Sequence, residues 1–411
     1  MSSLLIQNIA SLEVVLSPEQ TMLKGAAMNN YKSIENAFLL VENGTIAAFG
    51  EQRNAPERAD KIIDATDRLV LPGWCDSHTH LVFASSRENE FVDKIKGLSY
   101  EQIAANGGGI LNSAKRLNNT SEEALFDSAL LRLHEIAALG TTSVEIKSGY
   151  GLSVEGELKM LKVIRRLKEH TQLNIKATFL GAHAFPEEYK QDRDRYVQLI
   201  VNSMIPTIAN EGLADFIDVF CDKGFFTPQQ TATILEAGLK YNLVPKLHAN
   251  ELGETGGIET GVHYQARSVD HLEHTSAAHI ALLKNSNTMP TLLPSTAFFL
   301  RLPYAPARQM IDEGLPIALA TDFNPGSSPS GNMPFVLSLA CIQMKMLPKE
   351  AIAAATINGA YAMQTESKHG SITIGKKADL IITKPIESIA AIPYFFGGNC
   401  IAHTIVNGNI L

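Results

Sequence analysis

The sequence predicts an α/β protein, namely a (β/α)8 TIM-like barrel with a small β-sandwich domain built from both chain ends. Three observations support this prediction. From residue 69 onward, apolar strand-like runs alternate with amphipathic helical stretches, which is the pattern of repeated βαβ units. Eight strand candidates fall within about 250 residues, the size of such a barrel. Short strands gather instead at the two ends of the 411-residue chain.

The two chain ends are expected to form the small domain together. Their strand-like runs lie at 12–16, 37–42, 45–49, 379–383 and 401–406. Asn43-Gly44 between two of these runs is a strong hairpin signal, and Asn407-Gly408 is a second turn of the same kind. Because neither end is long enough for a stable domain alone, we expect residues 1–68 and 370–411 to pair into one discontinuous domain.

Residues 69–369 are expected to form the barrel. The predicted strands are 70–75, 142–146, 175–181, 216–220, 244–247, 268–270, 288–292 and 317–320, and helices are predicted at 121–139, 154–169 and 228–241. The first of these helices opens with the capping pattern of residues 120–123, and Gly140 ends it. An open doubly wound sheet would show the same alternation and is the alternative.

The composition is that of a globular protein without nucleic-acid or membrane partners. Hydrophobic residues make up 45% and charged residues 19% of the chain, which excludes disorder as its main state. The 35 Lys and Arg against 43 Asp and Glu give a net charge of −8, with no basic run for phosphates. The chain lacks an apolar run of about eighteen residues and the pattern of a signal peptide, so we expect a cytoplasmic protein. Four widely spaced cysteines fit neither a disulfide framework nor a thiolate zinc site: Cys75, Cys221, Cys341 and Cys400.

The most specific motif is His78-Thr79-His80, directly after the first predicted barrel strand. Residues i and i+2 of an extended chain face the same side about 6.6 Å apart, so both imidazoles can bind one metal ion. Taken alone, one buried polar histidine and one exposed histidine would be an equally good interpretation. The position at the carboxyl end of a strand, where barrel enzymes have their sites, favours the metal.

Other predicted strand ends carry the same kinds of ligand. His248 follows the fifth strand, His271 the sixth and Asp322 the eighth. Strands one and eight are neighbours in a closed barrel, so we expect His78, His80, His248 and Asp322 to meet above its axis. Three neutral nitrogens and one carboxylate oxygen suit Zn²⁺ and are also acceptable to Fe²⁺.

One metal ion and a hydrolytic reaction are expected from this ligand set. A bound metal with room for water generates a hydroxide nucleophile near neutral pH. A second metal would need a bridging ligand, such as a lysine at the end of strand four. That strand is predicted to end at residue 220, with Lys223 beyond the expected position, and Lys147 lies after strand two instead.

Residues 71–80, which contain this motif, resemble the first-strand signature of the amidohydrolase superfamily, and residues 374–380 are similar to its closing strand. Within the superfamily the chain resembles, over essentially its whole length, the branch that hydrolyses 4-imidazolone-5-propanoate to N-formimino-L-glutamate in histidine degradation. The stretches that carry this closer resemblance are 78–84, Arg87, 107–110, 147–151, 181–183, 248–251 and 321–326. The resemblance implies a metal-dependent barrel, one zinc or iron ion held by His78, His80, His248 and Asp322, and a homodimer.

The same resemblance implies contacts to a small anionic substrate from a set of residues in the loops above the barrel. They are Arg87, Tyr150, His183, Glu251, Asn324, Gly326 and Ser327. A propionate tail suits a guanidinium and a phenol, although Arg87 alone would be interpreted as a surface charge and Tyr150 as a loop anchor. His183 could orient the imidazolone carbonyl or cap a strand end, and the backbone N–H groups at 326–327 could bind substrate or only shape a loop. The glycine run 107–109 is expected to be a lid or a turn near the pocket.

Three side chains are expected to act in the reaction. Asp322 would take a proton from the attacking water, His271 would help to hold the oxyanion, and Glu251 or Asp322 would protonate the leaving ring nitrogen. Two other functions stay open, a mononuclear deaminase of cytosine or guanine from the same superfamily and a non-catalytic binding barrel. A nucleobase has no carboxylate for Arg87, and an inactive barrel has no reason to keep its metal ligands. Imidazolone hydrolysis is therefore the main hypothesis.

Overall fold

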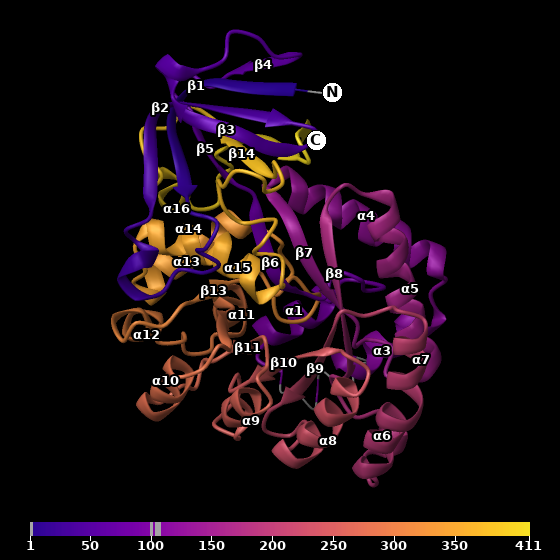
Figure 1. Ribbon diagram of the computed structural model, residues 1–411. Helices are drawn as coiled ribbons and strands as arrows, with labels where there is room; N and C mark the ends of the chain where they lie inside the picture. The colour runs from indigo at the N-terminus through magenta and orange to yellow at the C-terminus, as the bar shows by residue number, and fades with distance from the viewer. Residues whose placement is uncertain (1–2, 99–101, 103–107) are drawn as a thin grey trace.

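The computed structural model describes residues 3–98, 102 and 108–411 and has two parts (Figure 1). One part is a parallel eight-stranded barrel. The other is a mixed eight-stranded sheet that contains both chain ends and lies at the top of the view in Figure 1. The predicted fold class is therefore confirmed, and the open doubly wound sheet is excluded.

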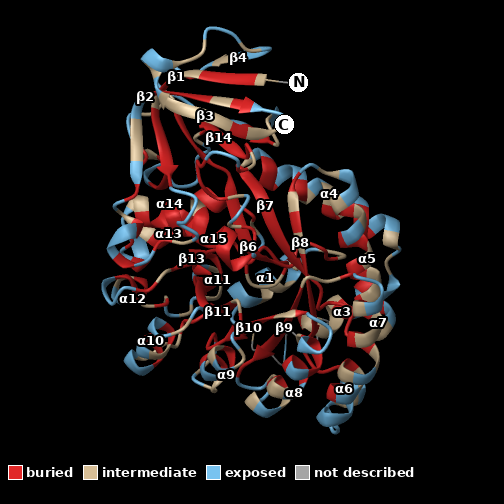
Figure 2. Ribbon diagram, viewed as in Figure 1, coloured by how far each residue is buried: buried red, intermediate tan, exposed pale blue. Residues whose placement is uncertain are grey.

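The barrel strands follow one another around the ring in chain order, and all neighbours are parallel. They are β6 Trp74–Thr79, β7 Thr141–Lys147, β8 Asn174–Ala182, β9 Phe216–Cys221, β10 Val244–Ala249, β11 Ser268–His271, β12 Met289–Leu292 and β13 Ala318–Leu319. A bridge between Thr79 and Phe323 closes the ring, where the His80 N–H donates to the Phe323 carbonyl at 2.9 Å. The barrel strands are buried almost throughout, as Figure 2 shows, because helices cover a parallel sheet on the outside.

Helices surround the barrel and fill the space between it and the small domain (Figure 1). They are α1 Glu88–Ile95, α3 Gly109–Asn119, α4 Glu122–Ala138, α5 Val154–His170, α6 Arg193–Leu199, α7 Ile205–Asn210, α8 Pro228–Leu239, α9 Gly257–His263, α10 Ala277–Lys284, α11 Pro294–Leu300, α12 Ala307–Asp312, α13 Met333–Met344, α14 Pro348–Ala355, α15 Ile357–Ala362 and α16 Ala391–Tyr394. The helices predicted at 121–139, 154–169 and 228–241 are confirmed as α4, α5 and α8. The N-cap of α4 is Ser121, which accepts a hydrogen bond from the Ala124 N–H, so the capping box predicted at residues 120–123 was placed one residue too early.

The small domain is one sheet in the order β16-β15-β14-β5-β1-β2-β3, with β4 beside β1. Its strands are β1 Ser3–Val15, β2 Lys32–Glu42, β3 Thr45–Glu51, β4 Lys61–Asp64, β5 Leu69–Pro72, β14 Leu380–Thr383, β15 Ile401–Val406 and β16 Asn409–Ile410. Ile6 and Leu39 from the first end pack with Leu380 and Ile405 from the second in one core. The two ends therefore depend on each other. The Asn43-Gly44 turn, with φ of 50° and 77°, joins β2 to β3 as predicted.

The strand predicted at 70–75 is two strands, and this prediction is wrong. β5 pairs with β1 and β14 in the small domain, whereas β6 pairs with β7 in the barrel. Gly73 separates them, because its own N–H donates to Asp379 in the small domain while the next N–H, of Trp74, donates to Gly140 in the barrel. A Cβ atom at Gly73 would overlap the Thr142 side chain, so only glycine fits. We propose that the two domains divide at Gly73 instead of residue 68.

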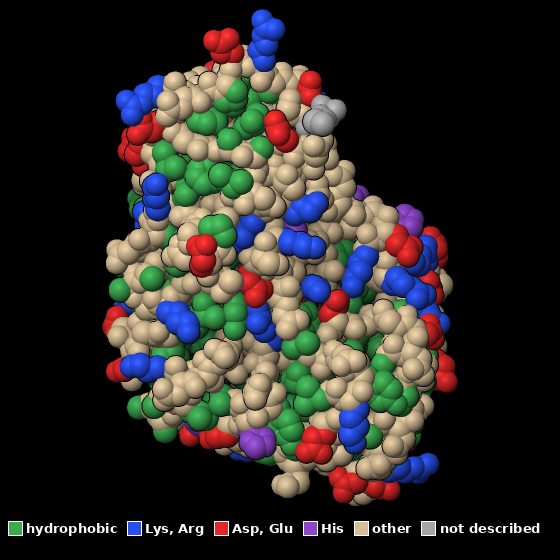
Figure 3. Space-filling model, in the orientation of Figure 1, with side chains coloured by type: hydrophobic (Ala, Val, Ile, Leu, Met, Phe, Trp, Pro, Cys, Tyr) green, Lys and Arg blue, Asp and Glu red, His purple; other side chains and the backbone are tan. Residues whose placement is uncertain are grey.

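The surface carries mixed charge on the face shown in Figure 3, where Lys and Arg side chains alternate with Asp and Glu. In the part of the chain that the structure describes, no helix has the length and apolar character that a membrane crossing needs.

Candidate metal centre and active site

The four predicted metal ligands lie at one end of the barrel, and their donor atoms converge. His78 Nε2 and His80 Nε2 each lie 3.5 Å from Asp322 Oδ1, and His80 Nε2 lies 3.4 Å from His248 Nε2. All four side chains are buried. A tetrahedral site with metal–ligand distances of about 2.0–2.1 Å has ligand–ligand edges of about 3.3–3.4 Å. These separations therefore fit one metal ion.

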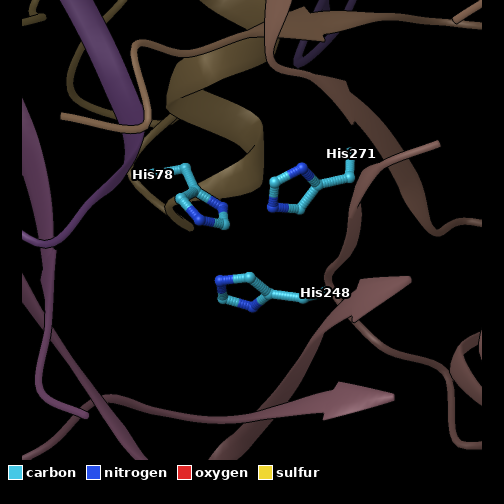
Figure 4. Close-up of side chains that lie close together, drawn as sticks. All are labelled: His78, His248 and His271. Atoms are coloured by element: carbon cyan, nitrogen blue, oxygen red, sulfur yellow. The ribbon is translucent and has the colours of Figure 1, made fainter. Parts of the chain in front are cut away.

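Two carboxylates below the cluster orient its histidines. His78 Nδ1 lies 2.6 Å from Asp270 Oδ2, and His248 Nδ1 lies 3.1 Å from Asp218 Oδ1. In each pair the ring donates Nδ1–H to the carboxylate, which leaves the Nε2 lone pair for a metal. His78 Nε2 is buried and has no hydrogen-bond partner among the described residues, so a cation is the partner that it suits. Figure 4 shows the rings of His78, His248 and His271 around a common centre.

His78 and His80 are held neutral, as metal ligands must be. Burial, with the positive charge of Lys147, keeps the pKa of His78 well below its ordinary value. Burial, with neighbouring histidines, does the same for the pKa of His80. Although burial opposes it, His248 and Lys147 lower the pKa of Asp218, so this carboxylate stays ionised as the hydrogen-bond acceptor of His248.

A fully buried ion-pair network lies one layer below the ligands. Lys147 Nζ lies 2.6 Å from Glu145 Oε1, 2.8 Å from Asp218 Oδ2 and 3.7 Å from Asp270 Oδ2. Lys246 Nζ pairs with the other Glu145 oxygen. Lys147 is therefore bound to carboxylates below the metal ligands, and nothing in its contacts points to a second metal.

The network residues were not predicted as site residues, although the sequence carries a signal for them. Side chains alternate along a strand, so the residue two positions before an inward-facing ligand also faces the barrel interior. Lys246 precedes His248 in this way, and Glu145 precedes Lys147. Charged residues at this spacing inside otherwise apolar strands indicate an internal ionic layer.

His271 and Glu251 border the same centre. His271 Nε2 lies 3.6 Å from Glu251 Oε2, and its Nδ1 lies 3.6 Å from Glu273 Oε1. Burial opposes the charging of His271, but Glu251 and Glu273 outweigh it and raise the pKa of the ring to about 10. Burial raises the pKa of Glu251 to about 7. The centre thus has a cationic donor beside a carboxyl group that exchanges its proton near neutral pH.

A cavity of about 1330 Å³ opens above the cluster, and every predicted substrate residue lines it. These residues are Arg87, Tyr150, His183, Glu251, Asn324, Gly326 and Ser327. The wall also carries cations that sequence reasoning did not single out: Lys94, Lys115, Lys190 and Arg193. Of the predicted glycine run, residue 107 lies outside the described residues, and Gly109 begins α3 beside the cavity.

Arg87 is held in the cavity wall by specific contacts. Its Nε donates to Ser113 Oγ at 2.9 Å and lies 3.7 Å from Glu90 Oε1, and its guanidinium carbon is 6.0 Å from the centre of the Tyr150 ring. A Cβ atom at residue 326 would press against Arg87 Nη1, so Gly326 leaves room for the guanidinium. Burial raises the pKa of Tyr150, so the phenol keeps its proton.

The Asn324 side chain holds the loop that follows β13. The Gly326 and Ser327 N–H groups, considered as donors to the substrate, both donate to Asn324 Oδ1 at 2.8 Å. Asn324 Nδ2 in turn donates to the Asp322 carbonyl and to Ser327 Oγ, each at 2.7 Å. Of the two roles considered for these backbone groups, the hydrogen bonds support the shaping of the loop, because the Asn324 amide uses them to fix the loop that carries Asp322.

Of the two roles considered for His183, orienting a carbonyl oxygen would need a hydrogen-bond donor at its free ring nitrogen. Its Nδ1 lies 3.0 Å from the Gly149 carbonyl, which can only accept, so Nδ1 carries the proton. Burial and His248 lower the pKa of His183 to about 3, so the ring is neutral and Nε2 is a hydrogen-bond acceptor. An acceptor suits a ring N–H of the substrate and does not suit its carbonyl oxygen.

Known proteins resemble this chain at two levels. Residues 226–411 match the model of the amidohydrolase family. The imidazolonepropionase of Flavobacterium johnsoniae is 56% identical over 408 residues, which cover 99% of each chain. The guanine deaminase of E. coli has a TM-score of 0.77, with 14% identity over 100% of this chain and 99% of that chain. The atrazine chlorohydrolase of Arthrobacter aurescens, complexed with zinc, has a TM-score of 0.68, with 15% identity over 99% of this chain and 95% of that chain. These two structures share the fold with this chain.

Proposed function

The chain belongs to the imidazolonepropionase family, and from this premise we propose that the buried cluster is its active centre and binds one zinc or iron ion. The enzyme is a hydrolase of histidine degradation that opens the ring of 4-imidazolone-5-propanoate to give N-formimino-L-glutamate. The observation that supports this site assignment is the meeting of His78, His80, His248 and Asp322 beneath a cavity lined by Arg87.

The ligand set suits the chemistry that such a hydrolysis needs. A divalent ion bound by His78, His80, His248 and Asp322 would make water more acidic and attract charge on the attacked carbonyl oxygen. Neutral imidazoles and a carboxylate fit zinc and iron alike, and the zinc in the related fold of the atrazine chlorohydrolase supports the first choice.

Three side chains divide the proton transfers in this proposal. Asp322 takes the proton of the attacking water, while the Thr296 hydroxyl holds its other oxygen at 2.6 Å. His271, positively charged beside Glu251, donates to the carbonyl oxygen as negative charge develops on it. Glu251 then gives a proton to the leaving ring nitrogen, because its carboxyl group is half-protonated near pH 7. The ring C–N bond breaks, and a carboxylate and a formimino group result.

The propionate tail of the substrate is assigned to the opposite side of the cavity. The Arg87 guanidinium, anchored by Ser113, and the protonated phenol of Tyr150 form a pair of donors for one carboxylate. Lys94 lies on the same side, where its Nζ donates to the Gly326 carbonyl at 3.3 Å. A cationic wall of this kind attracts an anion to a chain of net charge −8.

One assay tests this function against the alternative in the same superfamily. Purified protein with one equivalent of metal is mixed with 4-imidazolone-5-propanoate, and loss of the substrate absorbance is followed. Cytosine and guanine are tested in parallel for ammonia release. Turnover of the imidazolone alone supports the proposal, whereas deamination of a nucleobase without imidazolone turnover overturns it in favour of a deaminase. Absence of both activities in metal-loaded protein would favour a binding protein.

A homodimer is the proposed assembly, and an apolar patch near the C-terminal end supports it. The patch consists of Ile342, Leu347, Tyr394, Phe395 and Phe396, each 47–74% exposed, and all of them except Leu347 line a cavity of about 920 Å³. We estimate its exposed side-chain area at about 600 Å², close to the roughly 800 Å² that each partner buries in a stable interface. Aromatic side chains beside a hollow can fill the hollow of a second copy across a twofold axis.

Light scattering coupled to gel filtration tests the dimer. The wild-type protein should have twice the chain mass, Phe396→Asp should have the mass of one chain, and Leu131→Asp on the exposed face of α4 should stay dimeric. A monomeric wild-type protein, or a dimeric Phe396→Asp variant, would remove the patch from the assembly. The cytoplasmic location and the lack of nucleic-acid and membrane partners stay predictions from the sequence.

A further inference from the structure

Glu157 is a fully buried carboxylate that none of the proposed reaction steps uses. It lies in the first turns of α5, and its side chain turns back to the loop that joins β7 to α5. One oxygen accepts the N–H groups of Gly151 and Leu152, both at 2.8 Å, and the other accepts the N–H of Gly149 at 3.0 Å. Both oxygens of one buried carboxylate are thus used to hold a single short loop.

The loop held by Glu157 cannot easily take the same shape without it. Gly149 has φ of 109° and Leu152 has φ of 52°, both in the left-handed region. Such a backbone directs successive N–H groups inward, where each needs an acceptor away from water. Glu157 supplies that acceptor for three of them, so its charge compensates the unfavourable backbone of the loop.

The same loop fixes two groups in the wall of the substrate cavity. Tyr150 is the loop residue between two of the anchored N–H groups, and its buried side chain lines the cavity. The Gly149 carbonyl accepts the Nδ1–H of His183, which sets which ring nitrogen of His183 is left as an acceptor. The His183 ring also stacks on His80 at 5.1 Å and lies 5.4 Å from Tyr150. A shift of the loop would therefore move both groups together.

We propose that Glu157 is a positioning residue of the substrate site, which holds Tyr150 and His183 in place through the backbone of residues 149–152. It touches neither the substrate nor the metal ligands in this proposal. The proposal rests on the proposed function, because Tyr150 and His183 are substrate groups only if the cavity binds the imidazolone.

Glu157→Gln is the test, since the amide keeps the size of the side chain and loses half of its acceptors. We expect KM for 4-imidazolone-5-propanoate to rise about ten- to hundredfold, because an N–H of the loop loses its charged acceptor. The kcat should change less than threefold, and bound metal should stay at the wild-type amount. Glu155→Gln, two residues earlier on the exposed side of α5, is the matched control and should leave both constants unchanged.

A double-mutant cycle separates positioning from a general loss of stability. If Glu157 acts through His183, Glu157→Gln should raise KM much less in a His183→Ala background than in the wild type. Full additivity of the two effects, or an unchanged KM in the single variant, would overturn the proposal. If Glu157→Gln does not fold, Glu157→Asp keeps the charge and withdraws the oxygens by one methylene, and an unchanged KM there would overturn it equally. Failure of the proposed function would look different, because the wild-type protein itself would not turn over the imidazolone.

Discussion

Asp270 Oδ2 lies 2.6 Å from His78 Nδ1, and neither side chain is exposed to solvent. The carboxylate fixes the tautomer and the angle of the His78 ring, which lies on β6, the strand that directly precedes His80. Because Asp270 stands on β11, on the other side of the barrel, this hydrogen bond also ties the ligand strand to the sixth barrel strand. The orientation of His78, the first of the proposed metal ligands, is thus set by a residue outside the proposed ligand set.

Asp270→Asn should lower the affinity for Zn²⁺ by about ten- to hundredfold, because the neutral amide no longer holds His78 Nδ1–H as a charged acceptor. Competition with a chromophoric chelator measures this affinity. Asp312→Asn, an exposed carboxylate on α12, is the control and should bind the metal as the wild type does. Equal affinities in all three proteins would show that Asp270 does not tune the ligand.

Lys147→Met should lower the free energy of unfolding by about 3–5 kcal/mol, because Glu145, Asp218 and Asp270 would lose a buried cation. Urea unfolding of the metal-free protein measures the change. Lys162→Met, which removes a half-exposed pair 3.6 Å from Glu211, should cost less than about 1 kcal/mol. A loss of similar size in both variants would contradict the role given to the buried layer.

Arg87→Ala should raise KM about ten- to hundredfold and leave the bound metal unchanged, because it removes a charged donor to the substrate tail without touching a metal ligand. Steady-state kinetics and elemental analysis measure the two quantities on the same sample. Arg116→Ala serves as the control. Arg116 lies on the exposed side of α3, and its guanidinium donates a hydrogen bond to Ser85 Oγ. If the Arg87→Ala variant had the KM of the wild type, Arg87 would not bind the substrate.

The free energy of unfolding should increase as the pH rises from about 8 to 10.5, because the side chain of Lys376 is buried. Burial lowers the pKa of this amine from 10.5 to about 8, so the unfolded chain binds the additional proton throughout that interval. As the pH rises, the unfolded state loses the stabilisation that this additional proton gives it. The free energy of unfolding therefore increases. Thermal unfolding at several pH values should show the rise, and Lys376→Met should flatten it relative to Lys377→Met at the neighbouring, less buried position. Identical pH profiles for the two variants would contradict the assignment.

The sequence was sufficient to predict the barrel and the meeting of the four proposed metal ligands, because both depend on order along the chain. Strand ends in a parallel barrel meet at one rim, so His78, His248 and Asp322 could be placed together without coordinates. The division of the predicted strand at Gly73 could not be predicted. Residues 70–75 form one apolar run in the sequence, although the residues before and after Gly73 belong to different sheets. Glu157 and Asp270 were missed for another reason, since their partners are a backbone loop and a residue 192 positions away. Hydrogen bonds of this kind leave no pattern in the sequence.

The junction at Gly73 links the order of synthesis to the assembly of the active centre. β5 and β6 are adjacent in the chain, but β5 has its partner β14 only at residues 380–383. During translation the strand that bears His78 therefore emerges long before the sheet that anchors its upstream end is complete. Contacts over such a sequence separation form slowly. A ribosome-bound chain should consequently remain unable to retain metal at this centre until nearly all of it has been made.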